Sequence, residues 1–222
     1  MVLSTQDIAQ VLATAPSSAA LLDKLMQLEA DVSLRFGDTH MTSDTEFLST
    51  YYSSYFFALL LQDEIHEAHM LMKRLPASLV NLDATVQNTI SLLRAVWNKN
   101  YEKIYQTIRQ SQWPESIKNL VQQYQLHFQN KTFEDISVAY GTIRPSAAAA
   151  YLGLEATQED AMSDNADSTK PELVAMLTGK GWEWDAGSKL FIPKITTPIP
   201  KVSGSGSAVI GQLAAQLRSN GD

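Results

Sequence analysis

The strongest constraint on the fold is the recurrence of apolar residues at every third or fourth position between Leu3 and Asn130. This spacing places apolar side chains on one face of a helix and leaves polar side chains on the other. Four such stripes are Leu21, Leu25, Leu28 and Val32; Val86, Ile90, Leu93 and Trp97; Tyr101, Ile104, Tyr105 and Ile108; and Ile117, Leu120, Val121, Tyr124 and Phe128. The pattern predicts a series of amphipathic helices over residues 1–129.

Prolines and capping residues divide these helices. Pro16, Pro76 and Pro114 each interrupt the apolar spacing, because proline lacks an amide hydrogen and does not continue a helix. The run Ser43-Asp44-Thr45-Glu46 has the spacing of a capping box just ahead of Phe47. Breaks at about every 15–20 residues predict antiparallel helix pairs that stack on their neighbours, as in a solenoid. We find no sequence repeat to accompany them.

Residues 130–194 predict a different unit that begins with three short helices. A second capping-box spacing at Thr132-Phe133-Glu134-Asp135 predicts a helix that ends at Gly141. Ala147–Leu152 predicts another helix, closed by Gly153, and Pro171–Thr178 predicts a third.

The apolar period then changes from that of a helix to that of a strand. Trp182-Glu183-Trp184 alternates, Asp185–Ser188 has turn residues, and Lys189–Ile192 resumes as a second strand. Three helices followed by a hairpin is the element order of a winged helix, which we therefore predict over residues 130–194. The predicted fold class is mainly α, with solenoid-like helical repeats followed by a winged-helix subdomain.

The composition of the last part of the chain predicts a linker and a final helix. Residues 195–207 are rich in Pro, Gly and Ser and predict a flexible linker. Residues 208–222 predict a tail helix with one apolar face, formed by Val209, Ile210, Leu213 and Leu217. A helix of about 12 residues is only marginally stable alone in water. We therefore expect this helix to dock on something beyond its own domain.

Composition excludes several classes of protein. The 222 residues contain no cysteine, which excludes disulfides, thiolate catalysis and cysteine-ligated zinc. The longest apolar run, Tyr55–Leu61, is far shorter than the roughly 20 residues that cross a membrane. The first residues lack the basic flank and apolar stretch of a signal peptide. We expect a soluble intracellular protein.

The sequence predicts no catalytic, cofactor or metal site. His66-Glu67-Ala68-His69 carries two histidines, but the zinc-protease pattern requires a spacing of four residues. We expect these side chains to face solvent. No Gly-x-Ser-x-Gly motif is present, and the Gly-rich run Ser203–Ser207 follows prolines rather than a strand. We therefore predict that the chain is not an enzyme.

A nucleic-acid-binding winged helix is the competing class. Residues 131–194 carry six basic and ten acidic side chains, and Glu172 is the only charged residue of Pro171–Thr178. A DNA reader uses Lys or Arg on this helix to contact phosphates and bases. The aromatic residues Trp97, Tyr101, Tyr105 and Trp113 have helical spacing, which favours packing over base stacking. Protein contact is the better interpretation, and a salt-dependent gel shift would separate the two classes.

Several short strings, taken in order, resemble the PCI-domain family of the proteasome lid, the COP-nine signalosome and a translation initiation factor. They extend from about Tyr52 to Asp185 and are most similar to the small signalosome branch. The strings are Leu71–Pro76, Trp97–Tyr101, Ile104-Tyr105 through Ile108-Arg109 with Trp113, Leu152–Leu154, and Gly181-Trp182 followed by Asp185. The stretch between Gly153 and Gly181 is longer than the family pattern, with acidic extra residues around Ser163–Lys170.

The resemblance implies a non-catalytic scaffold subunit of the signalosome, the complex that removes a ubiquitin-like modifier from cullins with a zinc isopeptidase in a different subunit. The smallest lid subunit and the k subunit of the initiation factor are the alternatives within the family. The implied partners are other PCI-type subunits, with no nucleic acid, membrane or small-molecule substrate, and the implied localisation is cytoplasmic and nuclear.

The resemblance also implies two interfaces, a sheet edge at the hairpin and a shared bundle of C-terminal helices. The unpaired backbone of a two-stranded hairpin independently favours strand addition by a partner. The predicted interface residues are Trp182, Trp184, Leu190, Phe191 and Ile192 in the hairpin, and Val209, Ile210, Leu213 and Leu217 in the tail helix.

Overall fold

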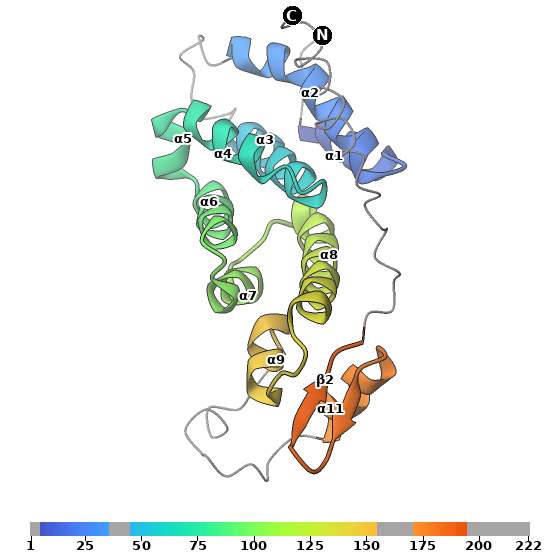
Figure 1. The fold of residues 1–222 in the computed structure, drawn as a ribbon. Coiled ribbons are helices and arrows are strands. Elements are labelled where there is room, and N and C mark those ends of the chain that lie inside the picture. Colours follow the sequence, from blue (N-terminus) through green and yellow to red (C-terminus); the bar gives the residue numbers. More distant parts are fainter. Residues whose placement is uncertain (1–4, 36–44, 155–170, 195–222) are drawn as a thin grey trace, which may run out of the picture.

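The computed structural model describes residues 5–35, 45–154 and 171–194, which form an elongated stack of helices with a small hairpin at one end (Figure 1). The helices are α1 (Thr5–Thr14), α2 (Ser18–Arg35), α3 (Thr45–Leu61), α4 (Ile65–Arg74), α5 (Ala77–Leu82), α6 (Ala84–Trp97), α7 (Tyr101–Gln110), α8 (Glu115–Ala139), α9 (Pro145–Leu152) and α11 (Pro171–Gly179). The strands are β1 (Glu183–Asp185) and β2 (Leu190–Ile192). The predicted mainly helical fold is confirmed.

The helix boundaries follow the prolines of the sequence. Pro16 lies between α1 and α2, Pro76 between α4 and α5, and Pro114 immediately before α8. Gly153 ends α9 in the left-handed conformation, with φ +61°, as glycine commonly does after the last helical residue. The predicted turn at Asp185–Ser188 joins the two strands, and the Asp185 carboxylate accepts a hydrogen bond from the amide of Gly187 at 2.9 Å.

Helix α3 is the centre of the larger hydrophobic core. It packs against α1, α2, α4, α5, α6 and α8, and every residue from Phe47 to Leu60 is buried. The longest apolar run of the sequence lies here, because a helix covered on all sides needs no polar face. Ser53, Ser54 and Ala58 are fully buried and leave space for the neighbouring helices to approach.

Polar groups fix the helices around α3. The Tyr51 hydroxyl donates to the carbonyl of Leu25 at 2.8 Å. The Tyr55 hydroxyl donates to the Glu29 carboxylate at 3.2 Å, and Arg74 forms an ion pair with the same carboxylate at 3.1 Å. These contacts join α2, α3 and α4, and they satisfy phenol groups whose rings lie in the core.

Helix α8 corrects one prediction, because no new helix begins at Thr132. The helix is continuous from Glu115 to Ala139, and Thr132 is a buried residue within it. No glycine or proline lies between these ends, so nothing removes a backbone hydrogen bond at Asn130. The Ser/Thr-x-x-Glu/Asp spacing marks helix starts only where the chain enters from outside a helix.

The C-terminal subdomain, residues 132–154 and 171–194, has a second and smaller core. This core contains Phe133, Ile136, Ile143, Ala148, Leu152, Leu177, Trp182 and Phe191. The end of α8, α9, α11 and the hairpin surround it, which is the element order expected for residues 130–194. The two cores meet within the uninterrupted helix α8, and the exact limits 1–129 and 130–194 stay a prediction. The predicted linker 195–207 and tail helix 208–222 lie outside the described residues.

Within the described ranges, no helix is both long enough and apolar enough to cross a membrane.

Candidate functional site

The hairpin is anchored to α8 by Trp182. Its side chain is 2 % exposed, and the indole Nε1–H donates to Ser137 Oγ at 2.8 Å. The indole also stacks on Phe133, with ring centroids 4.9 Å apart. Ser137 and Phe133 lie four residues apart on one face of α8, so a single side chain holds the hairpin to the last turns of that helix.

Strand β2 has partners on both of its sides. Trp184 of β1 lies opposite Phe191 of β2 in an antiparallel pair. On the other side of β2, Phe191 and Ile143 exchange two backbone hydrogen bonds, each 2.9 Å long. Both backbone groups of Phe191 thus point away from β1. The Trp184–Phe191 pair is therefore the non-hydrogen-bonded pair of the hairpin.

The outer edge of the sheet lies on β1 alone. Since Trp184 faces Phe191 in a non-hydrogen-bonded pair, its amide and carbonyl point away from β2. No residue in the described part of the chain forms a hydrogen bond with either group. One donor and one acceptor are available there to an added strand, whereas β2 has none to offer.

The structure narrows the predicted hairpin interface. Trp182 and Phe191 are 2 % and 0 % exposed, so these side chains belong to the subdomain's own core and offer no apolar surface to a partner. Trp184 shares their face of the sheet and is half-buried against Phe191, at 4.8 Å between ring centroids. Leu190 and Ile192 lie on the opposite face and are also half-buried. Contact of any of them with a partner stays a prediction.

The predicted tail residues Val209, Ile210, Leu213 and Leu217 lie outside the described residues. Two further residues on which the site depends were not predicted from the sequence. These are Ile143, which occupies the inner side of β2, and Ser137, which accepts the indole hydrogen bond of Trp182. Neither position has a local signal, because both contacts join residues 45 or more positions apart.

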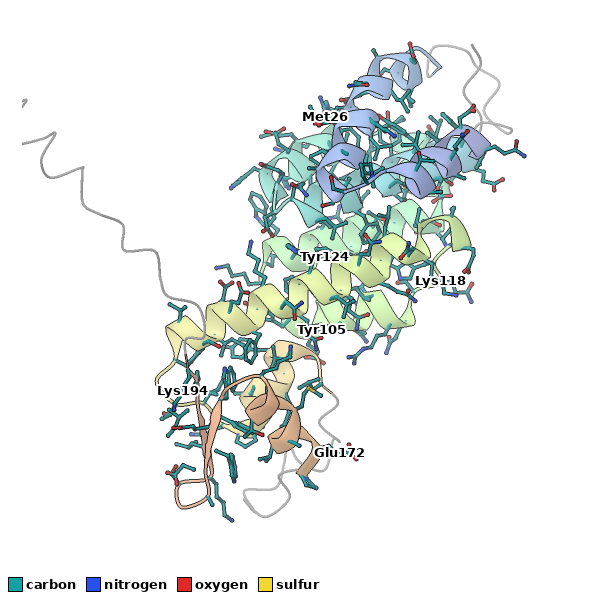
Figure 2. The ribbon with its side chains drawn as sticks, turned by 90° about the vertical axis from the view of Figure 1, so that its right-hand side faces the viewer. Met26, Tyr105, Lys118, Tyr124, Glu172 and Lys194 are labelled. Carbon is teal, nitrogen blue, oxygen red and sulfur yellow. The ribbon has the colours of Figure 1, made fainter. Side chains whose placement is uncertain are left out.

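A close contact joins the C-terminal subdomain to the helical stack. The ring of Tyr105 in α7 packs on the backbone of Gly153, where a β-carbon would lie 2.3 Å from the ring. The Arg109 guanidinium donates to the carbonyl of Gly153. From α8, the Gln129 side chain donates to the carbonyl of Leu152 at 2.8 Å. The end of α9 is thus held by both α7 and α8 (Figure 2).

Residues 46–201 match the sequence model of the CSN8/PSMD8/EIF3K family. The chain belongs to this family. A protein of Emericella nidulans named COP9 signalosome complex subunit 8 is 32% identical over 219 residues, 99% of this chain and 97% of that protein. Proteins of the same name from Xenopus laevis and Dictyostelium discoideum are each 24% identical. They cover 61% and 73% of this chain and 62% and 74% of their own length, respectively.

The family match includes the smaller core and the part of the larger core that begins at Phe47. It begins in the first turn of α3 and continues past β2, so it contains the hairpin edge and the contact at Gly153. The resemblance that the ordered strings between Tyr52 and Asp185 predicted is confirmed. The names of these relatives describe a subunit of a complex and mention no reaction.

The histidine pair of this family member lies against an exposed tryptophan. His66 and His69 of α4 contact the Trp97 ring, at 5.2 Å and 4.6 Å between centroids. Trp97 is 44 % exposed, so its ring packs between α6 and α4 as predicted but is not part of a buried core. It is the last residue of α6. No group of three or more potential metal ligands occurs in the described ranges.

The other aromatic residues of the predicted set pack as expected in a CSN8/PSMD8/EIF3K chain. Tyr105 is 3 % exposed. The Trp113 indole donates to the carbonyl of Ile108 at 2.9 Å and packs edge-on against Phe57 at 5.5 Å. Tyr101 is half-buried and meets Tyr151 of α9 at 5.0 Å. These rings therefore make contacts within the chain, as expected for packed residues.

Burial sets the ionisation of the core phenols. Loss of water around Tyr52 and Tyr55, together with the negative charge of Glu29, raises the pKa of each phenol to about 12. At Asp63, burial opposes ionisation, but hydrogen bonds from Lys131 and His127 outweigh it and lower the pKa. None of these groups has a pKa near neutral pH, where the pKa of an acid–base catalyst would lie.

Proposed function

We propose that this chain is a non-catalytic scaffold subunit of the COP9 signalosome, the complex that removes a ubiquitin-like modifier from cullin-RING ubiquitin ligases. The observation that carries the proposal is the 32% identity over 99% of the chain to a protein named as subunit 8 of that complex. Its partners are other PCI-type subunits, and it acts in the cytoplasm and the nucleus.

The outer edge of β1 is one means of assembly. The amide and carbonyl of Trp184 are free of partners within the described residues and point outward. A strand from a sibling subunit gains backbone hydrogen bonds there and extends the sheet. Leu190 and Ile192, half-buried on the adjoining face, add apolar contact area for such a partner.

The tail is the second means of assembly. Val209, Ile210, Leu213 and Leu217 have the spacing of one helical face. In an assembled complex this face packs against the corresponding helices of sibling chains, which supplies the burial that a short isolated helix lacks.

Two other subunit types share the family description, the smallest lid subunit and the k subunit of the initiation factor. The relatives from Emericella, Xenopus and Dictyostelium are all named as signalosome subunits, which favours that complex. The charge of α11 also favours a protein partner over nucleic acid, since Glu172 is its only charged residue.

The test is co-purification of the tagged chain with the other signalosome subunits. Trp184→Pro removes the outward amide without removing a hydrogen bond of the hairpin, because proline is accepted on edge strands. Trp184→Ala is the matched control, since it loses the same indole but keeps the amide. We expect Trp184→Pro to recover clearly less of the other subunits than Trp184→Ala. Equal recovery by both variants would exclude the strand-addition role.

Removal of the residues after Pro200 tests the tail. We expect the shortened chain to retain its helical circular dichroism signal, since both described cores lie before this point. We expect its recovery of sibling subunits to fall. Undiminished recovery would contradict the tail's role. Recovery of lid or initiation-factor subunits would show that the chain belongs to one of those complexes instead.

A further inference from the structure

Trp97 is an exposed aromatic residue whose ring is held by two neighbours. It is the last residue of α6 and is 44 % exposed. His69 stacks on the ring, and His66 meets it edge-on. Met70, which is 52 % exposed, lies four residues after His66 and is therefore its neighbour on the surface of α4. An aromatic ring that is already held in place loses little conformational freedom when a partner binds it.

Exposed basic side chains flank this ring. Lys73 lies one turn after His69 on α4, and Arg94 lies one turn before Trp97 on α6. Lys99 follows Trp97 by two residues. None of these three cations forms an ion pair with another described residue. We call this set the Trp97 surface, which consists of His66, His69, Met70, Lys73, Arg94, Trp97 and Lys99.

The acidic residue within α4 does not neutralise this surface. Glu67 and Arg74 are seven residues apart and therefore lie on the same flank of the helix. Arg74 forms its ion pair with Glu29 of α2 at 3.1 Å, so this flank faces α2 rather than Trp97. The whole chain carries a net charge of -7. A cluster of unpaired cations on an acidic chain favours a negatively charged partner.

An acidic peptide matches this surface better than a nucleic acid does. Binding to a nucleic acid through its backbone commonly uses about 6–10 phosphate contacts. Three cations on a chain of net negative charge do not supply that number. Two or three carboxylates around one apolar side chain match three cations around one tryptophan, and tryptophan and arginine are the residues that most often dominate protein interfaces.

We infer that the Trp97 surface binds an acidic peptide segment of a partner protein. A leucine or phenylalanine of that segment packs on Trp97 and Met70. Its aspartates and glutamates pair with Lys73, Arg94 and Lys99. The surface belongs to α4 and α6, whereas the outer edge of β1 belongs to the smaller subdomain. The inference therefore adds a second contact region and does not rest on the proposed signalosome role.

Fluorescence anisotropy of a labelled peptide, Glu-Asp-Glu-Leu-Phe-Asp-Glu-Asp, tests the inference on the full chain. We expect saturable binding at low ionic strength, and weaker binding as salt screens the exposed charges. The control peptide carries Gln and Asn in place of Glu and Asp. We expect it to bind about tenfold more weakly, because it retains the apolar contact and loses the charge pairs.

Two pairs of variants locate the site. Arg94→Glu should weaken binding of the acidic peptide about tenfold, whereas Lys118→Glu makes the same change of charge at an exposed site on α8 and should not. Trp97→Ala should also weaken binding about tenfold. Leu126→Ala truncates an apolar residue that is 61 % exposed and should have no effect. Circular dichroism checks that each variant keeps its helical content.

Nuclear magnetic resonance of the indole N–H groups gives a second measurement. The chain has four tryptophans, and the Trp97 signal is identified by its loss in Trp97→Ala. We expect the peptide to shift this signal and to leave that of the buried Trp182 in place.

The inference is overturned if the acidic peptide shows no saturable binding, or if Arg94→Glu and Lys118→Glu weaken binding equally. A shift of the Trp184 signal in place of the Trp97 signal would place the peptide at the hairpin and also overturn it. Tighter binding of an RNA oligonucleotide of equal charge would assign the surface to nucleic acid. Trp184→Pro should leave peptide binding unchanged, so failure here is distinguishable from failure of the co-purification test.

Discussion

The ring of Tyr105 lies directly against the backbone of Gly153, in the space that a side chain at position 153 would occupy. Gly153 also has a φ of +61°, a conformation that costs residues with a β-carbon about 1 kcal/mol or more. The contact joins α7 to the end of α9. Its loss would loosen the attachment of the C-terminal subdomain to the helical stack.

Gly153→Ala should therefore lower the free energy of unfolding by about 2–4 kcal/mol, from the φ penalty together with overpacking against the ring. Urea unfolding followed by circular dichroism measures this difference. Gly141→Ala is the control, because a β-carbon there would have no neighbour within 4 Å. A comparable loss in both variants would show that the Tyr105 contact is not the cause.

Ser137→Ala should reduce stability by about 1–3 kcal/mol, because it leaves the buried indole N–H of Trp182 without an acceptor. A double-mutant cycle with Trp182→Phe isolates the hydrogen bond. Ser137→Ala should cost less in the Trp182→Phe background, where no indole N–H remains. Equal costs in the two backgrounds would contradict the stated role of Ser137.

Stability should fall at alkaline pH through the buried phenols. An unfolded tyrosine ionises near pH 10, whereas burial and the nearby Glu29 raise the pKa of Tyr55 to about 12 in the folded chain. The unfolded state thus releases protons first, and stability declines from about pH 10 to pH 12. Tyr55→Phe should flatten this decline in unfolding measurements across that range. An unchanged slope in Tyr55→Phe would contradict this role of Tyr55.

Asp63 should contribute stability that acid removes. The carboxylate contacts Lys131 at 2.6 Å and His127 at 3.2 Å, and its pKa is lowered despite partial burial. The contribution is complete above the unfolded pKa of about 4 and is lost as the pH falls through the folded value. Asp63→Asn should cost about 0.5–1 kcal/mol at pH 7 and little in strong acid. A pH-independent difference would exclude the ion pairs as its source.

Local patterns determined much of the architecture. The prolines at 16, 76 and 114 and the glycine at 153 mark observed helix ends, and the alternation around Asp185–Ser188 marks the hairpin. These features are predictable because a missing amide hydrogen, a positive φ and a period of two or 3.6 residues act within a few positions of the chain. The strings that resembled the PCI family predicted the family in the same way.

Tertiary structure decided the rest. The stripe that ends at Trp97 and the alternation at Trp182 both suggested buried rings. Trp182 is buried because it contacts Ser137 and Phe133 of α8, whereas Trp97 remains 44 % exposed. The free edge of the sheet lies on β1, because Ile143, which is distant in the sequence, pairs with the side of Phe191 that faces away from β1. Burial and strand order depend on which distant segments meet. Periodicity is a local property that can be read from the sequence. Which distant segments come into contact is known only from the folded chain.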